Sequence, residues 1–156
     1  MEKDSLIGVP ANILLERASR EEVGLLCDAL QAFNSPFIGA GDEGSIHIVA
    51  HLPSGALAGG ILADVALGWM EIHVLWVDPE QRAAGLGASL LRACELEAME
   101  LGAHSSRLDT FDWQAETFYR RHGYACFGRL PDYPAGHERI FMSKRLTREV
   151  TEARDS

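Results

Sequence analysis

Apolar and polar residues alternate along the chain in a pattern that predicts strands packed against helices. Residues 69–77 are rich in β-branched and aromatic side chains, which is typical of a central strand. Asp78 and Pro79 end this strand, because proline has no N–H for the ladder and restricts the residue before it. Between residues 86 and 101, apolar residues recur along one stripe at nearly helical spacing, so a long helix is expected to follow.

Weaker patterns fill the rest of the chain. Ser19 and Glu22 have the S-x-x-E form of a capping box, so a helix is predicted to begin there. A further helix is predicted over residues 113–122, capped by Asp112 and ended by Gly123. Strands are predicted over residues 12–17, 45–52, 56–65, 105–110, 124–130 and 139–145. The order β-α-β-β-β-α-β-α-β-β predicts an α/β protein with a mixed central sheet flanked by helices.

Composition narrows the class of protein. A chain of 156 residues is expected to form one domain over residues 1–156, with a loose leader at 1–10 and a polar tail at 147–156. The net charge of −9 argues against nucleic acid as a partner. No apolar run approaches the length that a membrane span needs, so no membrane partner is expected.

The cysteines and histidines indicate the compartment and argue against a metal. Cys27, Cys94 and Cys126 lack the spacing of a disulfide framework or a metal site, which is typical of a reducing compartment. The histidines show no ligand spacing either, so no metal is expected. With no apolar signal-peptide core in the first ten residues, the chain is expected to be cytoplasmic.

The loop between the central strand and the long helix has the form of an anion-binding site. It holds Arg82, Gly85 and Gly87 in the pattern R-x-x-G-x-G. Free backbone N–H groups and the helix dipole attract a phosphate to such a helix N-terminus, and the two glycines leave room for it. Arg82 adds a fork of charged donors. The alternative is a plain strand-to-helix turn.

Two motifs in this order resemble those of the GCN5-related N-acetyltransferases, the GNAT superfamily. The stretch V-D-P-E-Q-R-A-A-G-L-G, residues 77–87, is similar to the family's acetyl-CoA-binding motif V-x-P-x-x-R-G-x-G-x-G. Here Ala83 replaces the first glycine, and Ala84 stands where many members carry a basic or polar residue. The stretch F-Y-R-R-H-G-Y, residues 118–124, resembles the signature F-Y-x-x-x-G-[FY]. The resemblance covers residues 46–146 and implies a GNAT-like fold.

The resemblance also implies the positions that bind acetyl-CoA and assist its reaction. The expected cofactor-binding residues are Leu75, Val77, Arg82, Ala83, Ala84, Gly85, Gly87, Ala88, Asp112 and Tyr119. A backbone N–H near Val77 is expected to stabilise the developing oxyanion. Tyr119 is expected to give a proton to the leaving thiolate, or else to be a packing residue. Asp112 replaces an asparagine that contacts the pantetheine arm, and an ionised aspartate only accepts hydrogen bonds.

The base that deprotonates the acceptor amine is expected on the central strand. Strand alternation predicts that Glu71, His73, Leu75 and Val77 share one face. Glu71 is the first choice, since some members of the family carry a glutamate base there. His73 is the rival because its ordinary pKa suits proton transfer at neutral pH. The remaining alternatives are a water chain as the proton acceptor, an ion pair of Glu71 with a basic neighbour, and a place for Glu71 at an exposed strand end.

The sequence thus predicts an acetyl-CoA-dependent N-acetyltransferase that acts on a primary amine of a small molecule or peptide. A non-catalytic acyl-CoA-binding module is the alternative within the same fold. An unrelated nucleotide-binding protein is disfavoured, because Ala88 and Ser89 follow Gly87 where a P-loop carries lysine. The loops at residues 34–44 and 131–138 are expected beside the acceptor. A homodimer is expected only from the family and from symmetry statistics.

Overall fold

The computed structural model describes residues 10, 12–39 and 41–148, which fall into two units divided after Gly39. The first unit contains helix α1 (Arg20–Asn34). Its start is confirmed, since the Glu22 N–H donates to Ser19 Oγ at 3.2 Å and the Ser19 N–H donates to Glu22 Oε2 at 2.7 Å. The expected leader and tail lie largely outside the described residues, and the single domain stays a prediction.

The strand predicted over residues 12–17 is wrong. These residues form a turn followed by irregular backbone, and the described part of the first unit contains no strand. A strand needs a neighbour to receive its backbone hydrogen bonds, so the apolar run of Ile13, Leu14 and Leu15 does not suffice to make one. The element order therefore begins with a helix.

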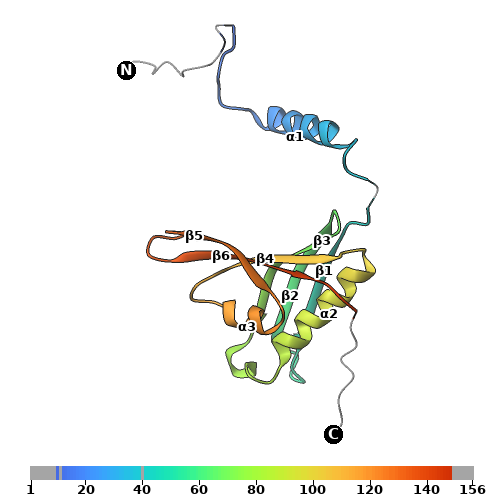
Figure 1. Cartoon of the computed structure of the whole chain (residues 1–156), viewed down its shortest axis with the longest axis vertical. Helices are drawn as coiled ribbons and strands as arrows, with labels where there is room; N and C mark the ends of the chain where they lie inside the picture. The colour runs from blue at the N-terminus through green and yellow to red at the C-terminus, as the bar shows by residue number, and fades with distance from the viewer. Residues whose placement is uncertain (1–9, 11, 40, 149–156) are drawn as a thin grey trace. The chain divides into compact units, whose positions relative to one another are not determined.

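The second unit is built on a six-stranded sheet in the order β1-β2-β3-β4-β6-β5 (Figure 1). Strands β3 and β4 are parallel and the other neighbours are antiparallel, which confirms the mixed sheet. The bounds of the strands are β1 (Gly44–His51), β2 (Leu57–Ala66), β3 (Trp69–Val77), β4 (Ser105–Phe111), β5 (Ala125–Pro131) and β6 (Glu138–Arg145).

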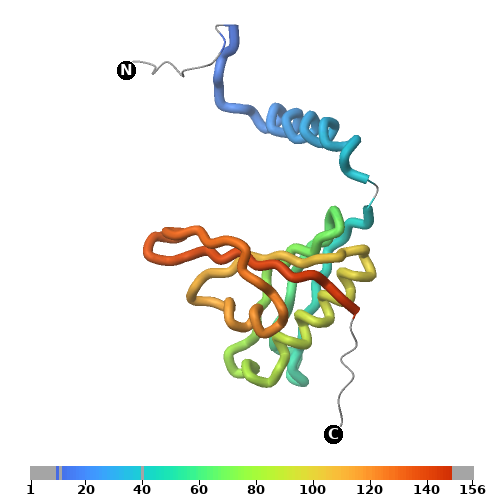
Figure 2. Tube along the Cα trace, viewed as in Figure 1, coloured from blue at the N-terminus to red at the C-terminus, as the bar shows by residue number. Residues whose placement is uncertain are grey.

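Helix α2 (Leu86–Glu100) covers one face of this sheet over β1, β2 and β3. The tube in Figure 2 shows the loop before α2 lying beside the short helix α3 (Glu116–Arg121). The core lies between α2 and the sheet, with Leu91 and Cys94 of the helix fully buried. Gly59 permits this packing, because a Cβ there would lie 2.8 Å from the Trp76 carbonyl oxygen and 3.3 Å from Leu90 Cδ1.

A buried polar network ties α2 to the far half of the sheet. Glu95 on α2 is 2% exposed and accepts from Lys144 Nζ at 2.8 and 2.9 Å. The Tyr124 hydroxyl lies 3.1 Å from Glu95 Oε1 and 2.9 Å from Ser106 Oγ. Since a phenol has one proton, it donates to the carboxylate and accepts from Ser106. Every member of this network therefore has a partner.

Helix α3 begins later than predicted, and Asp112 does not cap it. Residues 112–115 form a turn, and the cap position at Ala115 has no side-chain hydrogen bond. The Asp112 carboxylate instead lies 3.0 Å from His137 Nδ1 and accepts from the Glu138 N–H at 3.2 Å. The helix ends as expected at Gly123, whose φ of +88° suits glycine.

None of the helices in the described part of the chain has both the length and the apolar character to span a bilayer.

Candidate active site

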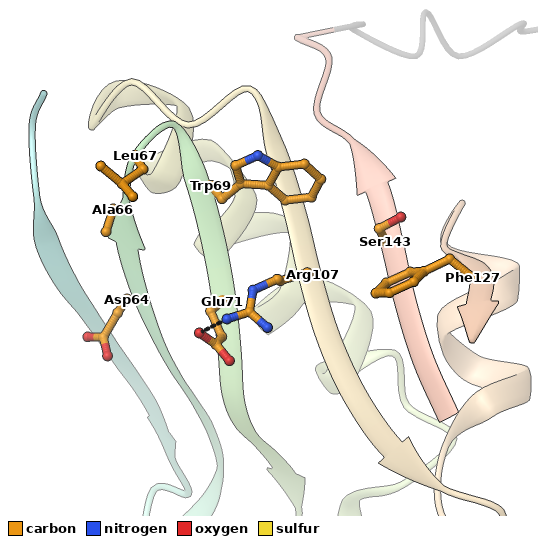
Figure 3. Close-up of a pocket in the computed structure, with 8 residues that line it drawn as sticks. All are labelled: Asp64, Ala66, Leu67, Trp69, Glu71, Arg107, Phe127 and Ser143. Atoms are coloured by element: carbon orange, nitrogen blue, oxygen red, sulfur yellow. Dashed lines mark hydrogen bonds and ion pairs between the residues drawn. The ribbon is translucent and has the colours of Figure 1, made fainter. Parts of the chain in front are cut away.

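The candidate site lies where two parallel strands separate. Strands β3 and β4 pair only from Trp69 with Ser105 to Ile72 with Leu108. Beyond these pairs β3 runs on to Val77 and β4 to Phe111, and the two strands diverge in Figure 3. A cleft of about 1000 Å³ opens there and is lined by both strands. One edge of β3 is therefore left without strand partners and offers backbone groups to a ligand.

A bulge in β3 changes which residues share a face. Leu62 of β2 pairs with Val74 and Ala63 pairs with Ile72, so His73 is an extra residue. The prediction that Glu71, His73, Leu75 and Val77 share one face is therefore wrong. Leu75 and Val77 pair with Ile61 and Gly59 on the α2 side, whereas Glu71 pairs with Asp64 on the opposite face.

The loop after β3 fits an anion. A short 3-10 helix η1 (Pro79–Gln81) leads to Gly85, the N-cap residue of α2, whose φ is +80°. No side chain caps the first turn of α2, which carries no acidic residue. A Cβ on Gly85 would meet no atom within 4 Å, so the space before the helix is open. The N–H groups of this turn are thus available to a phosphate.

Ala83 keeps the backbone path that a glycine would favour. Its φ is +69°, in the left-handed region, which costs about 1–2 kcal/mol for a residue with a Cβ. Arg82 precedes it and donates from Nε to the Val77 carbonyl oxygen at 3.1 Å. Both residues line the cleft. Ala83 therefore adds strain to the loop.

Tyr119 reaches the cleft from α3. Its side chain is buried, and no described residue hydrogen-bonds its hydroxyl group. Burial raises the pKa of Tyr119 to about 12. That is about 3.5 units above an ordinary thiol, so full proton transfer to a thiolate is uphill by about 5 kcal/mol. The phenol is better suited to donate a hydrogen bond to the sulfur than to give up its proton.

Glu71 faces a second hollow on the other side of the sheet. Its carboxylate accepts from Arg107 Nη2 at 2.5 Å (Figure 3). The hollow measures about 510 Å³ and mixes apolar and charged side chains. Its lining consists of Asp64, Ala66, Leu67, Trp69, Glu71, Arg107, Phe127 and Ser143. The ion pair with a basic neighbour, one of the alternatives for Glu71, is thus present.

His73 lines the cleft and pairs with a residue that sequence reasoning missed. Its Nε2 lies 2.8 Å from Asp64 Oδ2, and Ser45 Oγ donates to Asp64 Oδ1 at 2.7 Å. The hydrogen bond from Ser45, followed by that from His73, holds the pKa of the Asp64 carboxyl below its usual value. The two-residue turn at Leu67 and Gly68 places Asp64 opposite Glu71, a register that hairpin rules could have supplied.

The structure brings most of the predicted residues to the cleft. Of the expected cofactor-binding residues, all except Ala84 and Asp112 line it. Of the expected catalytic residues, Tyr119 and His73 line it and Glu71 does not. Arg121 lines it as well and was not predicted, although it lies two residues after Tyr119 in the second motif.

Comparison with known proteins agrees with this geometry. The family model for the acetyltransferase (GNAT) domain matches residues 43–126. Blasticidin-S acetyltransferase from Streptomyces morookaense is 41% identical over 93 residues, which are 59% of this chain and 68% of that protein. The chain therefore belongs to the GNAT family, and it is an N-acetyltransferase.

Solved structures show the same fold. An acetyltransferase from Bacillus cereus ATCC 14579 superposes with a TM-score of 0.80 at 30% identity, over 86% of this chain and 98% of that one. An acetyltransferase from Bacillus anthracis str. Ames, solved in complex with acetyl coenzyme A, superposes with a TM-score of 0.60 at 19% identity. That match covers 72% of this chain and 68% of the other.

Proposed function

We propose that this protein transfers the acetyl group of acetyl-CoA to a primary amine of a small molecule or peptide by direct attack. The separation of β3 and β4 next to the α2 N-terminus carries this proposal. It joins an anion-binding turn to a strand edge with free backbone groups, which suits a ligand with a diphosphate at one end and an amide-containing arm.

The residues at this cleft have distinct tasks. The first turn of α2 and Arg82 would hold the diphosphate, and Arg121 adds a second positive charge at the cleft. When bound, acetyl-CoA supplies the acyl group as a thioester. An N–H on the free edge of β3 would stabilise the oxyanion, and the Tyr119 hydroxyl would donate to the sulfur. The proton of the acceptor amine would be removed by a residue on the face of β3 that carries Glu71 and His73.

The acceptor would enter from the hollow shown in Figure 3. Asp64 and Glu71 give that hollow two carboxylates against the single cation of Arg107, and Trp69 and Phe127 give it apolar surface. Such a mixture favours a cationic amine with an apolar or planar body. Since one relative is a blasticidin-S acetyltransferase, blasticidin S is the natural first acceptor to test.

The donor is tested by thermal unfolding with and without acetyl-CoA. A ligand that binds only the folded state adds about 2.7 kcal/mol at one hundred times its Kd, which raises the midpoint by several degrees. The matched control is Arg82→Gln, which keeps a polar side chain and loses the charge, and should give a smaller rise. No rise at millimolar acetyl-CoA would contradict the proposal.

Catalysis is tested by release of the CoA thiol with blasticidin S and a panel of small amines and peptides. Thiol release that depends on the amine supports the enzyme. A thermal shift with no release for any amine would instead favour the alternative of a non-catalytic acyl-CoA-binding module.

A further inference from the structure

We propose that His73 is the base for the acceptor amine and that Asp64 is a positioning residue, which fixes the orientation and tautomer of the His73 ring. This inference rests on the proposed acetyl transfer and assigns a role for which the sequence left several candidates. It is carried by the bulge in β3 and by the contacts of Asp64 with His73 and Ser45.

The bulge places His73 at the point where the cleft begins. Ile72 makes the last pair between β3 and β4, and His73 is the next residue. As the extra residue of the bulge, His73 both lines the cleft and contacts Asp64 on the neighbouring strand β2. Among the candidate bases, it alone contacts both the donor cleft and the face that carries the acidic hollow.

Asp64 determines which ring nitrogen is free. Its Oδ1 is occupied by the Ser45 hydroxyl at 2.7 Å, and its Oδ2 lies 2.8 Å from His73 Nε2. An ionised carboxylate only accepts, so Nε2 must carry the proton and Nδ1 keeps its lone pair. No described residue hydrogen-bonds Nδ1. The carboxylate also stabilises the imidazolium that forms when Nδ1 takes a proton.

Glu71 is a poorer base in this arrangement. A proton on its carboxylate would break the ion pair with Arg107, and Glu71 does not line the cleft. The other charged groups near His73 do not compete for its ring. His47 on β1 contributes a weak field at Asp64, and Asp109 on β4 is paired with Arg139.

The proton and bond changes balance. The ammonium group of the acceptor gives one proton to His73 Nδ1, which passes it to solvent, and the free amine then attacks the thioester carbonyl carbon. The C–N bond forms as the C–S bond breaks. The second proton leaves the nitrogen and ends on the departing sulfur, so the products are an amide, a free thiol and one proton in solution.

The kinetic test compares the wild type with three variants and, below, two controls, with blasticidin S as acceptor, at saturating acetyl-CoA, across pH 5.5–9.5. His73→Gln should lower kcat about 100-fold or more, within the range for general base catalysis. Asp64→Asn should lower kcat at least tenfold and move the acidic limb of the pH profile to lower pH, because it removes a charge that stabilises the imidazolium. Asp64→Glu should recover part of the loss.

Matched controls separate this role from a structural one. His47→Gln replaces the neighbouring histidine on β1, which is not among the residues that line the cleft, and should leave kcat and the pH profile unchanged. Glu71→Gln should alter the KM for the acceptor and leave the acidic limb of the pH profile in place. Loss of that limb in Glu71→Gln, with its retention in His73→Gln, would overturn the proposal in favour of Glu71.

A second measurement does not need an acceptor. In the ¹⁵N-histidine-labelled protein, with the His73 signals assigned by their loss in His73→Gln, the neutral ring should show a proton on Nε2 in the wild type. Asp64→Asn should lose this preference. A wild-type ring protonated on Nδ1 would refute the role of Asp64. Failure of the acetyl-CoA thermal shift would refute the proposed function separately, with this NMR result unaffected.

Discussion

Replacement of Lys144 should destabilise the protein far more than replacement of a partly exposed lysine usually does. Lys144 is the cation beside Glu95, whose carboxylate is 2% exposed on α2. In Lys144→Met the side chain keeps an unbranched apolar chain and loses its charge. The carboxylate then remains buried with only the Tyr124 hydroxyl and the Arg92 guanidinium, 3.8 Å away, as partners. A buried charge without its counter-ion is costly.

The size of the effect follows from the burial of the pair. Breaking a buried ion pair from one side costs about 3–5 kcal/mol. The Lys144 side chain is 21% exposed and Tyr124 still donates, so the lower end, about 3 kcal/mol, is expected. That corresponds to a fall in the thermal midpoint of roughly 10 °C. Glu95→Gln should cost about 2 kcal/mol, since Lys144 can then reach water.

Urea unfolding of the two single variants and of Glu95→Gln/Lys144→Met measures the coupling directly. The double variant should cost about 2 kcal/mol, which gives a coupling free energy of about 3 kcal/mol. Arg148→Met is the matched control, because Arg148 makes a 2.9 Å ion pair with Glu100, which lies on α2 like Glu95. Both side chains of this second pair are more than 60% exposed. It should change stability by about 0.5 kcal/mol or less. Equal effects of Lys144→Met and Arg148→Met would refute the reasoning.

The remaining predictions concern single residues of the cleft and core. Ala83→Gly relieves a φ of +69° but adds chain entropy to the unfolded state, so it should raise the thermal midpoint by no more than a few degrees; a marked fall would show that the loop is not strained. Tyr119→Phe should lower kcat about 2- to 12-fold, the value of one hydrogen bond, with acetyl-CoA affinity unchanged in a thermal shift; full activity would make Tyr119 a packing residue. Burial raises the pKa of the Cys94 thiol to about 12, so at pH 8 it stays protonated, and mass spectrometry should find it alkylated by iodoacetamide only after unfolding; rapid native labelling would contradict this.

Local signals in the sequence predicted the parts of the fold that depend on neighbouring residues. The capping box at Ser19, the stop at Pro79 and the turn at Gly123 lie where the sequence placed them, because each depends on contacts within a few residues. The strand-loop-helix unit and the uncapped N-terminus of α2 follow from the same kind of local chemistry. Residues 12–17 carry a strand composition, but composition supplies no neighbouring strand to complete the ladder.

Long-range contacts explain the errors around α3. Asp112 followed a strand and preceded a helical pattern, which is a reasonable N-cap position. Its carboxylate is instead occupied by His137 and by the Glu138 N–H, some 25 residues further along the chain. No sequence pattern near Asp112 indicates these distant partners. Residues 112–115 form a turn instead, and the helix begins at Glu116.

The bulge at His73 is the feature of the site that sequence alternation could not supply. A single extra residue reverses the face of every position that follows it in a strand, so a perfect alternation from Glu71 to Val77 gives the wrong side for Leu75 and Val77. The reversal has two consequences at once. It turns Val77 toward α2, where its Cγ2 lies near Gly87, and it leaves His73 free to meet Asp64 at the edge of the cleft. Because one insertion serves both the packing of Val77 beside Gly87 and the contact of His73 with Asp64, removing it cannot restore a regular strand without losing one of them.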